Sequence, residues 1–426
     1  MRILITGASG FIGSHLTQAL CREHEVVACA RRAQRLKQRF PEIEALAVDL
    51  STRRSIDDWL PLLQGVDMVI NAVGIIRETG TQTFEHLHHR APCILFQASQ
   101  RAGVKKIIQI SALGSDETAS SRYHLSKKAA DDCLKQLDVD WIILKPSLVY
   151  GPGGQSAEFF KALAGLPWIP VVEQGEQLVQ PIHIDDLTAA VQALLSPHAP
   201  ARIAIDAVGP EPISLKRMLT TYRRWLGNTR KGTLPVPYAL SLFGAKLSGM
   251  LGIAPITGET IQMLRRGNAG NVSTLIRATG LTPRSFDIAL HEQPAQQADR
   301  WHARLFFLRP LLRLSIGLLW VFTGLVSLGL YPVEQSYALL AQVGIAGTMA
   351  PVALYSAALL DLALGIATLL RHRIQQVAII QITLMIAYSV LISIGPSELW
   401  LHPFGPITKN IPLIVATLIM MALEKD

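Results

Sequence analysis

The residues MRILITGASGFIGSHLTQAL (1–20) decide the fold class of this chain. They start as a short apolar strand, pass through a glycine-rich turn, and end with apolar residues at helical spacing. The turn has the pattern GxxGxxG at Gly7, Gly10 and Gly13. Gly7 permits the tight turn, Gly10 lets backbone approach a pyrophosphate, and Gly13 lets the helix pack on the strand. The helix N-terminus offers N–H donors to phosphates. This stretch therefore predicts a dinucleotide cradle.

Strand-like and helical segments alternate through the first 150 residues. The further strand segments are HEVVACARR (24–32), ALAVDL (45–50), VDMVINAVG (66–74), KKIIQISALGS (105–115) and DWIILKPSLVYGP (140–152). This alternation predicts an α/β fold with a Rossmann-type, doubly wound parallel sheet. Ligands of such sheets bind at the carboxyl ends of the strands. We therefore expect Asp49 and Leu50 beside an adenine, and residues 71–74 beside the ribose and nicotinamide.

The second strand segment bears on which nicotinamide cofactor is bound. An NAD enzyme usually has an acidic residue near this strand end for the ribose hydroxyls, whereas an arginine accommodates a 2′-phosphate. Here the segment ends in Arg31 and Arg32. The two arginines are either solvated surface charges or phosphate ligands. The sequence thus favours NADP(H), with NAD(H) as the alternative.

Five motifs in a fixed order carry a resemblance to a known superfamily. They are TGASGFIG (6–13), NAVG (71–74), YHLSK (123–127), KPSLVYGP (145–152) and PIHIDDL (181–187). Together they resemble the short-chain dehydrogenase/reductase superfamily, in its extended or atypical branch. Residues 234–268 are similar to the atypical group that includes the NADPH-binding accessory subunit of respiratory complex I. The resemblance covers residues 1–290 and implies a Rossmann domain with a smaller substrate lobe.

The resemblance implies roles for the YHLSK motif. Tyr123 would be the catalytic acid/base, and Lys127 would bind the ribose and lower the pKa of Tyr123 through its positive charge. Residues four apart share one face of a helix, so both can serve one site. The family also uses a Ser or Thr hydroxyl shortly after the strand that ends at Ser111. Alignment of the strand ends places Leu113 there, so Ser111 or Ser115 is expected to substitute.

The expected cofactor site combines the glycine turn, the two arginines, four strand ends and the lysine. It comprises Thr6, Gly7, Ser9, Gly10, Phe11, Ile12, Gly13, Arg31, Arg32, Asp49, Leu50, Asn71, Ala72, Val73, Gly74, Lys127 and Pro146.

Composition changes in the last quarter of the chain. Half of the 426 residues are hydrophobic and 17% are charged, which predicts a soluble part joined to a membrane part. The expected membrane spans are 311–330, 352–370, 374–394 and a shorter 407–423. The expected domains are a Rossmann domain at 1–150, a substrate lobe at 151–300 and a four-helix transmembrane bundle at 301–426. Residues 291–304 are expected to link head and bundle.

The flanking charges predict an orientation. Cations precede the first span, join the second to the third and follow the fourth, at Arg304, Arg309, Arg313, Arg371, Arg373 and Lys425. The other loops carry Glu334, Glu398 and Lys409. The positive-inside rule then puts the head and both termini in the cytoplasm, at the cell inner membrane. Four cysteines without CxxC spacing fit a reduced cytosolic domain.

A second resemblance covers residues 305–426. The segments LLWVFTGLVSL (318–328) and WLHPFGPITKNIP (400–412), with the span containing Asp361, resemble the DoxX-like four-helix membrane module. A carboxylate within a span usually faces the bundle interior. Two roles stay open for Asp361. One is a proton, quinone or lipid-headgroup site with His402, Lys409 or Tyr388; the other is a helix–helix hydrogen bond.

Two kinds of site are not expected. The net charge of +8 could suggest nucleic acid, but the basic residues are scattered or flank apolar spans, which fits anionic lipid better. His183, Asp185 and Asp186 could suggest a metal site. They are interpreted instead as a turn whose acids suit a helix start. We therefore expect no metal.

The sequence thus predicts a membrane-anchored NADPH-binding reductase or dehydrogenase. A hydrophobic carbonyl or alcohol, such as a quinone, isoprenoid or lipid, is the expected substrate, with residues 239–253 lining its pocket or touching the bilayer. The alternative is a non-catalytic accessory, assembly or sensing protein of a membrane complex, because the complex I group implies a structurally held cofactor. A transporter regulated by the head is a third alternative, which the few polar groups within the spans disfavour.

Overall fold

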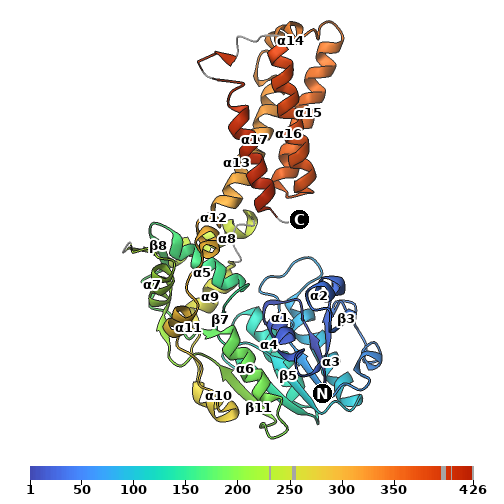
Figure 1. Cartoon of the computed structure of the whole chain (residues 1–426), viewed down its shortest axis with the longest axis vertical. Helices are drawn as coiled ribbons and strands as arrows, with labels where there is room; N and C mark the ends of the chain where they lie inside the picture. Colours follow the sequence, from blue (N-terminus) through green and yellow to red (C-terminus); the bar gives the residue numbers. More distant parts are fainter. Residues whose placement is uncertain (230–231, 252–255, 395–399, 404, 425–426) are drawn as a thin grey trace. The chain divides into compact units, whose positions relative to one another are not determined.

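The structure, a computed structural model, describes residues 1–229, 232–251, 256–394, 400–403 and 405–424 (Figure 1). These form two compact units, Met1–Arg304, called the head below, and Leu305–Asp426, called the membrane unit. Residues 252 and 253, Glu398 and Lys425, on which the sequence expectations drew, lie outside the described residues.

A parallel sheet forms the centre of the head. Among the described residues it has seven strands, in the order β11-β6-β5-β4-β1-β2-β3. They are β1 (Arg2–Thr6), β2 (Glu25–Ala30), β3 (Glu44–Ala47), β4 (Met68–Asn71), β5 (Lys106–Ile110), β6 (Asp140–Pro146) and β11 (Ile203–Ala207). The strand order reverses between β1 and β4, which is where a doubly wound sheet opens to receive a ligand. The predicted α/β fold is confirmed.

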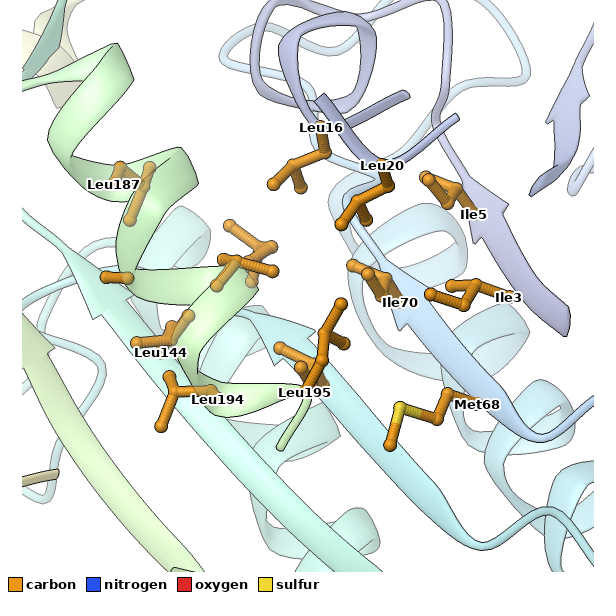
Figure 2. Packing of buried hydrophobic residues seen from close by; sticks show 14 of the residues in the cluster. Ile3, Ile5, Leu16, Leu20, Met68, Ile70, Leu144, Leu187, Leu194 and Leu195 are labelled. Carbon is orange, nitrogen blue, oxygen red and sulfur yellow. The ribbon is translucent and has the colours of Figure 1, made fainter. Parts of the chain in front are cut away.

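Helices cover both faces of this sheet. One face carries α1 (Phe11–Leu20), α2 (Ala33–Arg39), α6 (Ile184–Leu194) and α10 (Val272–Thr279). The other carries η1 (Leu60–Leu63), the π-helical η2 (Glu85–Arg90), α3 (Ala91–Arg101) and α4 (Arg122–Lys135). Figure 2 shows Leu16 and Leu20 of α1 on the side of Ile5 and Ile70, and Leu187 and Leu194 of α6 beside Leu144. Each such buried side chain stabilises the fold by about 1.5–3 kcal/mol.

The rest of the head forms a smaller lobe of short strand pairs and helices. Its strands are β7 (Val149–Tyr150) with β10 (Ile182–His183), β8 (Ile169–Val172) with β13 (Thr233–Val236), and β9 (Leu178–Val179) with β12 (Ile213–Ser214). Its helices are α5 (Gln155–Gly165), α7 (Leu215–Trp225), α8 (Tyr238–Leu251), α9 (Gly258–Arg266), α11 (Phe286–Glu292) and α12 (Gln297–Leu305). The rings of Tyr150 and Tyr222 pack 4.8 and 4.9 Å from that of Phe286.

The chain passes between sheet and lobe more than once. After residue 151, α6, β11 and α10 return to the main sheet, so the expected boundary at 150/151 does not separate two continuous segments. The expected linker at 291–304 is also largely part of the head. Asp299 in α12 accepts a hydrogen bond from Lys161 at 3.1 Å, and Ala303 is buried in the lobe core.

The membrane unit consists of helices. They are α13 (Leu308–Leu325), which continues into the π-helical η3 (Val326–Leu330), α14 (Val333–Gln342), α15 (Met349–Leu369), α16 (Ile374–Ile394) and α17 (Asn410–Leu423). Among the described residues, three helices are long and apolar enough to cross a membrane, namely Leu308–Leu330, α15 and α16. The expected fourth span is shorter than predicted. Gly405 has φ +53° and residues 406–409 form a turn, and the helix starts only at residue 410.

Small residues let α13 and α15 approach closely. A Cβ on Gly324 would lie 2.8 Å from the carbonyl oxygen of Ala358, and one on Gly365 would lie 2.6 Å from the amide of Val321. Such contacts are a common basis of helix pairing in membranes. On the same two helices, Thr323 donates a hydrogen bond of 3.5 Å to Oδ2 of Asp361. This long contact fits the helix–helix alternative for Asp361, while its Oδ1 is buried without a hydrogen-bond partner among the described residues, so both predicted roles stay open.

Three arginines meet one carboxylate at the end of the bundle where the chain enters. Glu424, almost fully buried, lies 3.2 Å from Arg309, 3.0 Å from Arg313 and 2.9 Å from Arg371. Arg313 is equally buried. A buried charge is tolerated when it is paired and hydrogen-bonded, so this cluster ties α13, α17 and the α15–α16 loop together.

The close approach at Gly13 generates a stability prediction. A Cβ there would lie 2.2 Å from the carbonyl oxygen of Gly7, and backbone cannot yield easily. We expect Gly13→Ala to destabilise the head by about 1–3 kcal/mol, because this overpacking outweighs the helix propensity of about 1 kcal/mol that alanine contributes. The measurement is thermal unfolding of the full chain in detergent.

Gly244→Ala is the matched control. Gly244 lies within α8, and an added Cβ would meet no heavy atom within 4 Å among the described residues. This variant is expected to unfold at the wild-type temperature or slightly above it. Equal losses for the two variants would contradict the packing argument.

Candidate active site

The glycine turn between β1 and α1 is closed by backbone contacts. Gly7 has φ +71°, and a Cβ on it would lie 2.7 Å from the carbonyl oxygen of Ala72. The amide of Gly10 donates to the carbonyl of Gly7 at 2.9 Å. Helix α1 starts without a side-chain cap and without an acidic residue in its first turn. Its N–H groups therefore suit a phosphate, and the turn fits a dinucleotide.

A ladder of buried polar side chains crosses the sheet beside this turn. Thr6 Oγ1 donates to Asn71 Oδ1 at 2.6 Å, and Asn71 Nδ2 donates to Gln109 Oε1 at 2.7 Å. The three residues are register partners on β1, β4 and β5, and all are fully buried. The sequence placed Thr6 and Asn71 against the cofactor. In the structure their side chains bond each other, so we expect these residues to meet a cofactor through their backbone.

Lys127 lies at the ends of two neighbouring strands. Its Nζ donates to the carbonyls of Val73 and Ile110, each at 3.0 Å, and the position of a Cβ on Gly74 would be 3.5 Å from Nζ. Burial lowers the pKa of Lys127 to about 8, while the carboxylate of Asp131 opposes this shift. The structure thus brings together Gly7, residues 72–74 and Lys127, as the sequence predicted.

Ser111 is placed differently from its expected role. Its hydroxyl donates to Oδ2 of Asp131 at 2.6 Å, and both residues are buried. Burial raises the pKa of Asp131 to about 6. A hydroxyl committed to a carboxylate is poorly placed to polarise a substrate oxygen. Ser115, the other candidate, has its hydroxyl buried without a partner among the described residues.

Tyr123 stands among aromatic rings on the first turn of α4. Its ring centroid lies 5.8 Å from that of Phe84, 5.2 Å from that of His88 and 5.4 Å from that of His124. Burial raises the pKa of Tyr123 to about 12. The sequence predicts that Lys127 lowers this pKa, whereas in the structure burial of the phenol raises it. Tyr123 keeps its proton at neutral pH.

His88 supports Tyr123 and was missed by the sequence argument. It is fully buried, and burial lowers its pKa to about 2, so the ring is neutral. Nε2 accepts the amide N–H of Ile75 at 2.9 Å, and Nδ1 lies 3.0 Å from Ser126 Oγ. His88 therefore joins the loop after β4 to α4. No spacing signal links it to the YHLSK motif, 35 residues away.

An apolar cavity of about 340 Å³ opens at Tyr123. We call it the apolar cavity; its wall includes Phe11, Ile12, Ile76, Ser111, Leu113, Tyr123, His124, Pro146, Phe159, Phe160, Ile261, Leu264 and Asn268. His124 contributes a neutral ring, since burial lowers its pKa to about 4. Phe11, Ile12 and Pro146, expected at the cofactor, thus border this cavity. None of residues 239–249 belongs to this wall, and the side chains of the other residues predicted there, 250–253, lie outside the described part of the chain.

The remaining expected cofactor residues lie along the same carboxyl edge of the sheet. Ser9 is exposed in the glycine turn. Arg31 and Arg32 are exposed directly after β2, and Asp49 and Leu50 follow β3. The structure thus places the arginines where an adenosine ribose is bound in such folds.

The turn at residues 183–186 (HIDD) has a structural role. His183 caps α6, its Nδ1 accepting the amide N–H of Asp185 at 3.2 Å. Asp186 accepts a hydrogen bond from Arg284 Nε at 2.8 Å. These contacts tie the start of α6 to the loop before α11, as a turn rather than a ligand set.

Comparison with known proteins agrees with this geometry. An NAD(P)H-binding family model matches residues 7–159, and a DoxX-like family model matches residues 317–418. Ceramide reductase of Caulobacter vibrioides is 30% identical over 200 residues, which cover 45% of this chain and 60% of that protein, less than two thirds of its length. Mouse mitochondrial NADH dehydrogenase (ubiquinone) 1 alpha subcomplex subunit 9 is 26% identical over 267 residues, 59% of this chain and 68% of that one.

A solved structure shows the same fold in the head. UDP-glucuronic acid 4-epimerase from Bacillus cereus, in complex with UDP-glucuronic acid and NAD, has a TM-score of 0.53 and 19% identity, and the match covers 71% of this chain and 99% of that one. The chain therefore joins an NAD(P)H-binding Rossmann domain, similar to complex I subunit 9 and to reductases of the short-chain type, to a C-terminal DoxX-like domain.

Proposed function

We propose that this protein is a membrane-anchored, NADPH-dependent reductase of a hydrophobic carbonyl, such as a lipid, isoprenoid or quinone. The observation that carries the proposal is the position of Tyr123 in the wall of the apolar cavity. A phenol that keeps its proton, next to a cavity lined mainly by apolar side chains, suits an apolar carbonyl substrate. The likeness to a protein named ceramide reductase supports a lipid as that substrate.

The residues have distinct tasks in this reaction. The nicotinamide supplies the hydride when it is bound. Tyr123, with its pKa raised to about 12, donates the proton that the carbonyl oxygen requires, and the tyrosinate regains a proton from solvent. Lys127 holds the ends of β4 and β5 in place, and its remaining N–H can serve the ribose. The glycine turn and the first turn of α1 hold the pyrophosphate.

The alternative function has one observation in its favour. Ser111 donates to Asp131, and Leu113 occupies the wall position expected for a catalytic hydroxyl. A site with a weakly polarised substrate oxygen would suit a protein that holds NADPH for stability, assembly or sensing, where the cofactor stabilises the head by mass action. The likeness to complex I subunit 9 supports this alternative.

Membrane attachment and orientation complete the proposal. The arginine cluster at Glu424 lies at the end of the bundle where the chain arrives from the head. A cationic end favours the cytoplasm, so we place the head and both termini there, at the inner membrane. On the head, α8 exposes Leu240, Phe243 and Leu247 at helical spacing, a face that suits lipid.

The proposal predicts that Tyr123→Phe abolishes turnover but not cofactor binding. The variant keeps the ring among its aromatic neighbours and removes only the proton donor. We expect NADPH oxidation, followed by fluorescence in membranes supplied with a native lipid extract, to fall by at least about 100-fold. Tyr238→Phe, which removes a hydroxyl on the lobe surface, is the control and should match wild type. Bound NADPH that stays reduced in wild type and variant alike would favour the accessory function.

The arginines predict the cofactor preference. If Arg31 and Arg32 bind a 2′-phosphate, the double change to serine removes charge-assisted hydrogen bonds. The Kd of NADPH should then rise by about tenfold or more, while that of NADH stays within about twofold. Fluorescence titration of both cofactors measures this. Arg22→Ser, an exposed position at the end of α1, should change neither value. An equal loss for both cofactors would contradict the assignment.

A further inference from the structure

A second cavity of about 430 Å³ adjoins the apolar cavity. The two share Leu113 and Asn268 as wall residues. The charged residues Asp116, Lys145, Asp206 and Arg266 line the second cavity, which we call the polar annex. The polar annex thus lies beside the apolar cavity, separated from it by Leu113 and Asn268, and within reach of a ligand that passes these two side chains.

The charged groups of the polar annex are held in place by the fold. Lys145 and Asp206 are register partners on β6 and β11, at the carboxyl ends of the strands. Lys145 Nζ donates to the carbonyl of Ser115 at 2.9 Å, and Asp206 Oδ2 accepts the amide of Asn271 at 3.0 Å. A site whose polar groups are already oriented loses little entropy when a ligand binds.

The opposite wall is equally fixed. Arg266 ends α9 and reaches the loop after β5, where Nη2 lies 2.7 and 2.8 Å from the two carboxylate oxygens of Asp116. Its Nη1 donates to the carbonyl of Gly114 at 2.8 Å. Helix α9 also supplies Ile261 and Leu264 to the apolar cavity. The same helix therefore contributes to the walls of the apolar cavity and of the polar annex.

The charges of the polar annex balance. Two cations, Lys145 and Arg266, face two carboxylates, Asp116 and Asp206. An anionic headgroup would meet two carboxylates, and a cationic one would meet two cations. A neutral group with both donors and acceptors faces no such repulsion.

One atom indicates which neutral groups fit. Oδ1 of Asn268, on the wall common to both chambers, is buried without a hydrogen-bond partner among the described residues. A buried acceptor without a donor is costly. Because this oxygen has almost no accessible surface, the Asn268 side chain has to turn toward a cavity before a ligand hydroxyl or amide N–H can satisfy it.

We propose that the polar annex binds the polar end of the substrate, and that this end is uncharged and bears hydroxyl or amide groups. This inference rests on the proposed reductase function, and it identifies the substrate as a neutral amphiphile. Its ketone lies between an apolar chain in the apolar cavity and a hydrogen-bonding end in the polar annex. The polar annex, rather than the apolar cavity, then determines which of several lipids of similar chain length binds most tightly.

The test uses three synthetic ketones of equal chain length, ending in a diol, a carboxylate or an ethyl group. Binding of each to the full-length protein with NADP⁺ in nanodiscs is measured by calorimetry, and turnover by NADPH oxidation. We expect the diol to bind about tenfold more tightly than the other two. Lys145→Met and Asp206→Asn should each remove most of that advantage while leaving the ethyl-ended ketone unchanged.

Lys105→Met is the matched control, because this exposed lysine pairs with Asp67 outside both cavities. It should leave every affinity unchanged. Tighter binding of the carboxylate, variants without effect on the diol, or no binding of any ketone would overturn the inference. Selective binding of the diol without turnover would support the proposed role of the polar annex and would contradict only the reductase function. The two proposals can therefore fail separately.

Discussion

The backbone contact between Gly13 and Gly7 is the constraint on which the site depends. A Cβ on Gly13 would stand 2.2 Å from the Gly7 carbonyl oxygen, so α1 can lie against the β1 turn only because no side chain is there. Gly7 in turn packs on Ala72, at the end of β4. This packing sets the N-terminus of α1 at the point where the strand order reverses. The strand end that carries Val73 then meets Lys127, and Phe11 reaches the wall of the apolar cavity.

The pKa shifts in the site come mainly from burial of the ionisable groups and less from attraction between opposite charges. Lys127 and Asp131 are both desolvated, which lowers the pKa of the lysine to about 8 and raises that of the acid to about 6. Each charge opposes the shift of the other, without cancelling it. Tyr123 has its pKa raised to about 12 by the same cause. The phenol is therefore protonated at neutral pH, as a proton donor must be, although the raised pKa makes it a weaker acid than an exposed tyrosine.

The sheet could be predicted from sequence because its signals are local. The spacing of Gly7, Gly10 and Gly13, and the apolar runs of the strands, specify elements and their order without knowledge of any partner. Side-chain roles depend instead on what the fold brings near. Nothing beside Ser111 in the sequence shows that Asp131 will accept its hydroxyl, and nothing marks His88 as the group behind Tyr123. The contacts of Arg266 could not be predicted for the same reason, because its partners Asp116 and Gly114 are about 150 residues away in the sequence.

The central claim concerns the head: we propose that Tyr123 and NADPH together reduce a lipid carbonyl. The most direct measurement supplies NADPH deuterated at the nicotinamide C4 to membranes carrying the protein, and analyses the lipids by mass spectrometry. We expect a lipid alcohol that gains one carbon-bound deuterium with wild type and none with Tyr123→Phe. Deuterium that stays in a stoichiometrically bound cofactor, with no labelled lipid in either sample, would contradict it.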